Sequence, residues 1–393
     1  MITQLLKLKV KKKELFLLEV LKHEKKINCA VLKELFEEFG SEQLYALTLH
    51  NKISSIAANA LESCHILDES HMAWHQASAE MEARIKSYMA ELDKIAVLLR
   101  SVDINLVALK NSGITRGLYQ NYPSSPMGDI DVLVSPSKFR LAHELLINNG
   151  YELKFRSPLE EQNIHKAELG GGAEYLVKLP NDEALWFELQ WRPVAGRWIR
   201  PDQEPSADEL LSRAHAIEGS DVLLLSPEDN LLQVALHTAK HSFVRAPGFR
   251  LHTDVDRIVH STNINWDIFV ELVCKLQVKT PVYFSLALAS DLLGTPIPPD
   301  VLIAIQPSWW KRKVIAMWLQ RVGLFDPDGR KWSRLGYIFF VILLYDDFMG
   351  FVRSLIPSVS TLKKLYDEDR SLIVPLLYIK RIYDLIFKRT LVK

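Results

Sequence analysis

Met127-Gly128-Asp129-Ile130-Asp131-Val132-Leu133-Val134 is the most informative stretch of the chain. In it, two carboxylates alternate with aliphatic residues and follow a glycine. Alternate side chains of a β-strand share a face, so the two aspartates are predicted to project together while the aliphatic residues pack beneath. Neighbouring carboxylates repel each other unless a cation lies between them, and Mg²⁺ prefers such hard oxygen ligands. For an isolated pair of this kind, the alternative is a strand end with both acids in solvent.

The composition is that of a globular protein with two or three domains: 393 residues, 48% hydrophobic and 24% charged. Lys and Arg number 48, as do Asp and Glu, so no overall field favours nucleic acid. The longest apolar run, 335–345, covers 11 residues, whereas a membrane-spanning helix needs roughly 20. We therefore expect no transmembrane segment, although the C-terminal part could touch a membrane surface or a partner.

The three cysteines, Cys29, Cys64 and Cys274, are far apart in sequence and form no C-x-x-C pair. This spacing argues against a disulfide framework and against a structural zinc site. It fits a reducing compartment, so we expect a cytoplasmic location.

The pattern of apolar residues divides the chain into three parts. Residues 1–100 are predicted to be a helical N-terminal region, in which Gly40 ends a helix. Residues 101–204 are predicted to be an α+β core with a mixed sheet: strands at 104–109, 129–134, 151–155, 174–179 and 184–190, a turn at 110–113, and helices at 114–120 and 136–148. Residues 205–393 are predicted to be helical again, with a clear helix start at Ser226-Pro227.

A third carboxylate is available in the strand predicted at 184–190. By alternation, Glu188 shares a face with Trp186 and Gln190, opposite Phe187 and Leu189. A neighbouring strand would place Glu188 beside the two aspartates. Three converging acids form a site for one or two divalent ions, which can clamp both oxygens of an in-line phosphoryl displacement. Taken alone, Glu188 would be read first as a solvent-facing acid on a half-buried strand, and only its company with Asp129 and Asp131 favours a site.

These elements, in this order, resemble the uncharacterised nucleotidyltransferase family of the DNA polymerase β-like superfamily. The resemblance rests on the segments 107–110, 118–119, 128–134, 149–151 and 187–192, on the later pair His237 and His241, and on 251–255 and 355–358. It covers roughly residues 40 to 390 and implies a polymerase β-like core flanked by helical regions.

The resemblance implies a Mg²⁺-dependent reaction with two ions, or Mn²⁺ in their place. Asp129 and Asp131 would be metal ligands, and Glu188 would be the third carboxylate, orienting or deprotonating the acceptor hydroxyl. A nucleoside triphosphate such as ATP would lose pyrophosphate. Lys110 and Ser112, together with Gly128, would contact the nucleotide, although an exposed Lys110 at a strand end is an equal alternative.

Several positions depart from the family pattern. Asn111-Ser112 replaces the usual glycine pair after the first strand, Gln190 replaces a common histidine, and an arginine common near position 125 is missing. His237 and His241 are four residues apart, on one helix face. They could bind zinc, pack at a domain interface near Asp254, or line the nucleotide cleft beside Lys240.

Two classes of function remain open from the sequence. The first is transfer of a nucleoside monophosphate to an unidentified acceptor, either a small molecule, a peptide or a partner protein. The second is a degenerate protein of the same fold that binds a nucleotide or a partner without catalysis. The departures from the family pattern at Asn111 and Gln190 suggest this alternative. A nucleic-acid acceptor is not expected, because the composition is electrically neutral.

Overall fold

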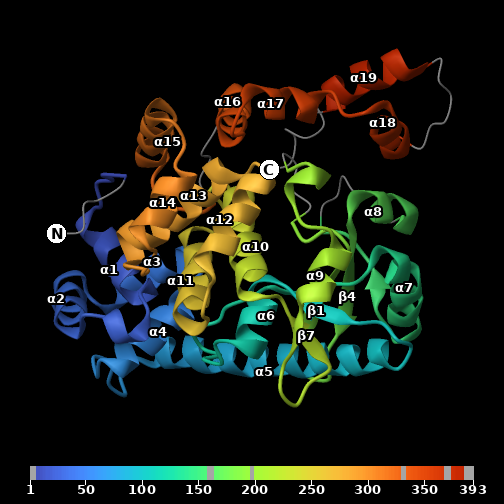
Figure 1. The fold of residues 1–393 in the computed structure, drawn as a ribbon. Coiled ribbons are helices and arrows are strands. Elements are labelled where there is room, and N and C mark those ends of the chain that lie inside the picture. The colour runs from blue at the N-terminus through green and yellow to red at the C-terminus, as the bar shows by residue number, and fades with distance from the viewer. Residues whose placement is uncertain (1–5, 157–162, 195–198, 329–332, 367–372, 385–393) are drawn as a thin grey trace.

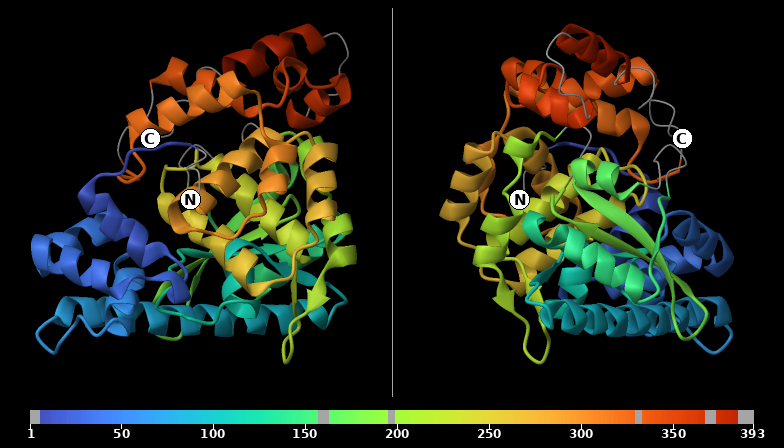
Figure 2. Two further views of the ribbon diagram at one scale, coloured as in Figure 1. Left: turned by 60° about the vertical axis from the view of Figure 1, so that its left-hand side comes forward. Right: turned by 90° about the vertical axis from the view of Figure 1, so that its right-hand side faces the viewer.

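The computed structural model describes residues 6–156, 163–194, 199–328, 333–366 and 373–384. In these residues one seven-stranded mixed sheet is surrounded by helices (Figure 1 and Figure 2). The predicted α+β class, with helical regions on both sides of the core, is confirmed. None of the described helices is both long enough and apolar enough to cross a membrane.

The N-terminal region is helical, as predicted. It contains α1 (Lys12–Leu21), η1 (Glu24–Lys26), α2 (Cys29–Phe39), α3 (Ser41–His50), α4 (Ser54–Ser63) and α5 (Met72–Arg100). The side chain of Asn28 begins α2 by accepting hydrogen bonds from the backbone amides of Ala30 and Val31. Gly40 ends it with a φ of +77°, which glycine adopts without strain.

The expectation for the cysteines is wrong at one pair, because Cys29 and Cys64 form a disulfide. They lie 35 residues apart in sequence, but the packing of α1 against both α2 and α4 brings their Cα atoms to 5.3 Å. Sequence spacing carries no information about this packing. Cys274 is a free thiol.

The sheet runs in the order β3-β4-β5-β2-β1-β7-β6. Its strands are β1 (Leu106–Ala108), β2 (Asp129–Leu133), β3 (Glu152–Leu153), β4 (Gly172–Lys178), β5 (Ala184–Gln190), β6 (His215–Ala216) and β7 (Val222–Leu224). The central strand β2 is antiparallel to β1 and parallel to β5. The parallel pair sets Asp131 opposite Glu188 and Asp129 opposite Trp186.

The two faces of β2 and β5 have different environments. One face carries apolar side chains that are fully buried in a core that includes side chains of α5: Ile130, Val132, Phe187 and Leu189. Helix α7 (Phe139–Asn148) packs against β5, and α5 runs along the lower edge of the molecule in Figure 1. The carboxylates therefore project from the opposite face, as the alternation of the sequence predicts.

The remaining elements of the core are short. They are α6 (Lys110–Gly117), η2 (Pro136–Lys138), α7 (Phe139–Asn148), α8 (Ile164–Gly170), η3 (Pro201–Gln203) and α9 (Ala207–Arg213). Residues 110–113 were expected to be a turn, but they form the first turn of α6. Gly113 allows this, since a Cβ at its position would lie 2.5 Å from the carbonyl oxygen of Ala108. The helix can therefore begin directly against the strand that precedes it.

The C-terminal half is largely helical, as predicted, except that 215–224 contributes β6 and β7 to the sheet. The helices are α10 (Pro227–Lys240), η4 (Phe249–Leu251), α11 (His252–Ser261), α12 (Trp266–Lys275), α13 (Lys279–Leu288), η5 (Ala289–Leu293), α14 (Pro299–Ile305), α15 (Trp309–Val322), α16 (Arg334–Leu344), α17 (Phe348–Leu355), α18 (Val359–Tyr366) and α19 (Val374–Tyr383). Ser226 caps α10 as predicted, by accepting from the amide of Asp229.

Candidate active site

Three carboxylates meet on the face of the sheet that carries the aspartates of β2. Asp129 and Asp131 project from β2, and Glu188 projects from the adjacent strand β5. One oxygen from each lies within 4.8 Å of an oxygen of the others. The strand alternation and the parallel register produce this convergence directly. Three hard oxygen donors at such spacing are suited to a divalent cation such as Mg²⁺.

Lys110 is the first cation that neutralises these acids. Its Nζ lies 2.6 Å from Oδ1 of Asp131 and 3.7 Å from Oε2 of Glu188. The side chain is buried, so the alternative of an exposed lysine is wrong. Its backbone has a φ of +52°, and its amide donates to the side chain of Gln233 on α10. The side chain of Lys110, the first residue of α6, thus extends to the carboxylates on β2 and β5.

Arg156 is the second cation at the acids and comes from the segment after β3. Its guanidinium lies 2.6 Å from Oδ2 of Asp129, 3.2 Å from Glu174 and 3.9 Å from Glu188. It also stacks over the ring of Trp186. Because 39% of the Arg156 side chain is exposed, this ion pair forms the solvent-facing side of the site.

The buried charges shift the pKa values of the acids in opposite directions. Burial raises the pKa of Asp131 well above its usual range; Lys110 opposes this rise, and the other two carboxylates add to it. Burial also disfavours ionisation of Glu188. Lys110 and a hydrogen bond from Asp131 outweigh that effect and lower the pKa of Glu188 to about 2. Asp131 therefore holds a proton more readily than Glu188.

Polar groups next to the carboxylates complete the site. Gln190 on β5 donates through Nε2 to Oδ1 of Asp131 at 3.0 Å, so it stabilises this carboxylate from the neighbouring strand. The hydroxyl of Ser112 accepts from the backbone amide of Asp131 at 3.0 Å. Asn111 donates to the carbonyl oxygens of Ser125 and Pro126, and so ties α6 to the loop before β2. The Asn111-Ser112 pair thus fixes β2 and the loop before it relative to α6.

Gly128 lies at the open side of the site. A Cβ at this position would meet no atom within 4 Å, so there is room beside the backbone just before Asp129. Close by, Arg250 donates to the carbonyl oxygen of Pro126 at 2.5 Å. Its buried Nε has no partner among the described residues. A buried donor without a partner is costly, and an anion would satisfy it.

His237 on α10 and His241, which directly follows that helix, lie near Lys110 and Lys240. Their rings are 4.8 Å apart, and Nδ1 of His241 bonds to the carbonyl oxygen of Ala246. Burial lowers the pKa of both, to about 3 for His241, and the nearby lysines add to this. Both rings are therefore neutral at physiological pH. Among the described residues, the potential metal-binding clusters do not include either histidine.

Two cationic residues of the site, Arg156 and Arg250, were not identified from the sequence, whereas Lys240 was expected beside the nucleotide cleft. Lys240 lies near the acids, since Asp131 and Glu188 both favour its charged form, although burial and Lys110 together lower its pKa. Its Nζ donates to the carbonyl oxygen of Val194. Only the fold brings Arg156 and Arg250 to the site, and no local pattern marks them. Lys240 is marked in the sequence by its position between the two histidines.

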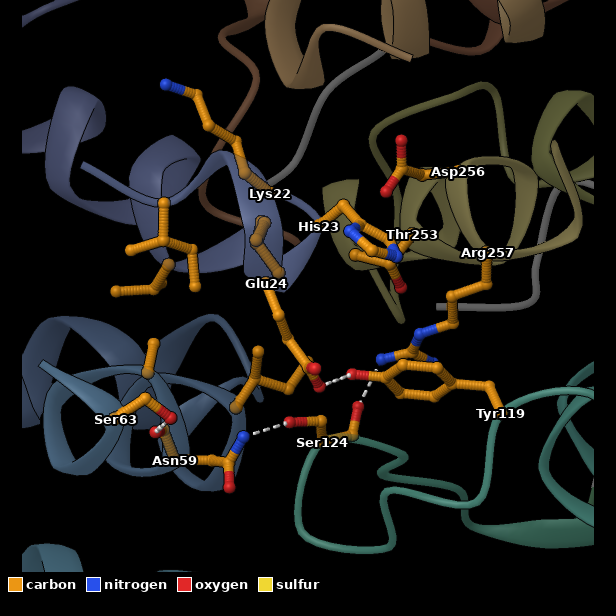
Figure 3. A pocket seen from close by; sticks show the side chains of 15 residues that line it. Lys22, His23, Glu24, Asn59, Ser63, Tyr119, Ser124, Thr253, Asp256 and Arg257 are labelled. Atoms are coloured by element: carbon orange, nitrogen blue, oxygen red, sulfur yellow. Dashed lines mark hydrogen bonds between the residues drawn. The ribbon is translucent and has the colours of Figure 1, made fainter. Parts of the chain in front are cut away.

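A separate pocket lies between the N-terminal helices and α11 (Figure 3). On its floor, the hydroxyl of Tyr119 donates to Glu24 at 2.6 Å, and Arg257 stacks over the Tyr119 ring. Arg257 also donates to the carbonyl oxygen of Ser124, and Asn59 donates to its hydroxyl. The N-terminal region therefore holds the loop that leads into β2. None of the three carboxylates lines this pocket.

Comparison with known protein families gives one match. The family described as "Uncharacterised nucleotidyltransferase" matches residues 37–294, which include all three carboxylates, the cations around them and α10. The matched range ends before α14, so the C-terminal helices lie outside it. Searches among curated proteins and among solved structures returned no significant match.

Proposed function

Because the chain belongs to this family of uncharacterised nucleotidyltransferases, we propose that it transfers a nucleoside monophosphate from a nucleoside triphosphate to a hydroxyl or phosphate acceptor. The observation that carries the proposal is the convergence of the three carboxylates of β2 and β5 within 4.8 Å. In the reaction, an acceptor oxygen forms a bond to the α-phosphorus. The bond from that phosphorus to the bridging oxygen breaks, and pyrophosphate leaves with its electrons.

Asp129, Asp131 and Glu188 would hold the divalent ions, one or two of Mg²⁺ or Mn²⁺. Such ions neutralise charge on the phosphates and polarise the α-phosphate. The three-oxygen donor set fits them chemically. Glu188 would also orient the acceptor hydroxyl or accept its proton. Catalysis rests on positioning and charge, as in other phosphoryl transfers.

The cations around the acids would bind the triphosphate, for which ATP is the first donor to test. Lys110 supplies a fixed positive charge beside Asp131. Arg250 supplies a buried donor that has no partner within the described part of the chain. Ser112 and the space beside Gly128 complete the predicted phosphate side. The neutral rings of His237 and His241 would line this cleft next to Lys240.

One observation favours a second candidate, the non-catalytic protein of the same fold. Lys110 and Arg156 already neutralise the carboxylates through ion pairs of 2.6 Å, and Gln190 donates to Asp131. A site that is stabilised without metal could bind a nucleotide and regulate a partner. For the location of the protein we propose the cytoplasm, on the basis of the wide cysteine spacing; the Cys29–Cys64 disulfide is the one observation that opposes a reducing compartment.

Calorimetric titration of each NTP with Mg²⁺, combined with a pyrophosphate-release assay, tests the proposal. Wild type should bind one NTP and release pyrophosphate with a panel of hydroxyl and phosphate acceptors. The Asp129→Ala/Asp131→Ala variant should lose both properties. Equal NTP binding by the two proteins, with no pyrophosphate from either, would favour the non-catalytic alternative.

A further inference from the structure

The C-terminal helices α15 to α19 form a band across one end of the molecule, at the top of Figure 1 and of both views in Figure 2. This band lies outside the family match. It contains twelve of the twenty large hydrophobic side chains that are exposed among the described residues. Single exposed apolar residues are ordinary, but their concentration in 309–383 marks an interaction surface.

The helix α19 shows the pattern most clearly. Four of its large apolar side chains are between 45% and 64% exposed, namely Leu376, Ile379, Ile382 and Tyr383, whereas Leu377 is buried. Their spacing of three, six and seven residues from the first places them on one side of the helix. The helix therefore turns an apolar stripe towards solvent and buries its other side.

The other helices of the band add aromatic residues. Trp309 and Trp310 begin α15 and are 70% and 47% exposed, and Phe348 begins α17 and is 71% exposed. Trp is the residue most characteristic of the region where a protein meets lipid headgroups, because its ring is apolar and its N–H is polar. The exposed residues are thus of the type that inserts shallowly into a bilayer surface.

Charge identifies the partner. Residues 306–393 contain sixteen Lys and Arg but only eight Asp and Glu, a net charge of +8 in a chain whose total is zero. The first 305 residues are correspondingly acidic. Exposed apolar side chains within a basic segment match an anionic lipid surface, where basic residues bind headgroups and apolar ones enter the acyl boundary.

We propose that the C-terminal surface formed by α15–α19 docks the protein onto the surface of an anionic lipid bilayer. The chain lies on the bilayer without crossing it, in keeping with the lack of a spanning helix among the described residues. The sheet with the carboxylates lies away from this band (Figure 1). Docking is therefore independent of whether the site is catalytic.

Flotation of the full chain with lipid vesicles tests this. Wild type should float with phosphatidylcholine vesicles that contain phosphatidylglycerol and stay behind with phosphatidylcholine alone. High salt should weaken the binding, because it screens surface charge. The Leu376→Ser/Ile379→Ser variant should bind at least about tenfold more weakly, since two inserted apolar side chains are lost. Ile268→Ser, at an equally exposed position on α12, should bind like wild type.

Circular dichroism and thermal melting of each variant check that the fold is kept. Lys313→Glu/Arg321→Glu, at two exposed positions of α15, provides a second route and should also reduce flotation. Three results would overturn the proposal: no flotation with anionic vesicles, equal flotation with both lipids, or wild-type flotation of both variants. A wild-type dimer that the α19 substitutions convert to a monomer would also overturn it, because a second copy would then cover the surface.

Discussion

Replacing Arg156 with glutamine should strengthen the binding of a divalent metal to the acidic site. Arg156 neutralises Asp129 at 2.6 Å and lies 3.9 Å from Glu188, so it competes with a cation for the same oxygens. Two unit charges 4 Å apart interact by about 1 kcal/mol in water and about 4 kcal/mol near a protein surface. Arg156 is 39% exposed, which places the interaction towards the lower value. A divalent ion doubles the repulsion that the guanidinium exerts on it.

We therefore expect Arg156→Gln to gain about 1–2 kcal/mol in metal affinity, a decrease in Kd of about 5- to 30-fold. Mn²⁺ titrations followed by calorimetry and electron paramagnetic resonance would measure this without nucleotide. Arg140→Gln is the matched control, since Arg140 pairs with Glu168 away from the carboxylates and is exposed to a similar degree.

The double variant Asp129→Ala/Asp131→Ala sets the baseline, at which Mn²⁺ binding should be lost. If Arg156→Gln binds Mn²⁺ as wild type does, or more weakly, the guanidinium and the metal do not compete. If wild type and the double variant bind Mn²⁺ equally, the carboxylates are not a metal site at all. The two failures are thereby distinguished.

Three further predictions concern stability. Cys29→Ser should lower the free energy of unfolding by about 3–4 kcal/mol under oxidising conditions, because the disulfide closes a loop with a sequence separation of 35. Cys274→Ser, which removes a free thiol, should not lower it; equal stability of wild type with and without reductant would contradict the prediction. Gly113→Ala should cost about 1–3 kcal/mol in urea unfolding because its Cβ would meet a backbone carbonyl, and Gly128→Ala, in open space, should cost much less; equal costs would refute the reasoning. Burial raises the pKa of Asp254 from 3.8 to about 6. The contribution of Asp254 to stability is therefore greatest below about pH 4 and falls by about 3 kcal/mol as the pH rises to about 6. Asp254→Asn should remove this pH dependence, and a stability difference between wild type and variant that stays constant from pH 4 to 7 would count against it.

The alternation of acids and aliphatic residues was enough to predict the faces of two strands. Asp129 and Asp131 share a face because successive side chains of a strand alternate, a rule that needs only local sequence. The arrival of Glu188 beside them depends in addition on the pairing of β2 with β5. The start of α10 at Ser226 was predictable from local sequence as well, since a cap depends on three or four neighbouring residues.

What the sequence left undetermined depends on contacts between distant segments. Arg156 reaches Asp129 from the segment after β3, and Gln233 reaches Lys110 across 123 residues. The Cys29–Cys64 disulfide depends on how three helices pack. No periodicity marks such pairs, because each partner is an ordinary residue within its own element. The contributions of Arg156 and Arg250 to the site therefore emerged only from the three-dimensional arrangement.

The most direct test of the central claim is to incubate the protein with Mg²⁺ and an NTP labelled at either the α- or the γ-phosphate, in a lysate of the source cells. Wild type should transfer the α-label to an acceptor, and Asp129→Asn/Asp131→Asn should not. Transfer of the γ-label instead, or equal α-label transfer by wild type and the variant, would contradict nucleotidyl transfer at these carboxylates.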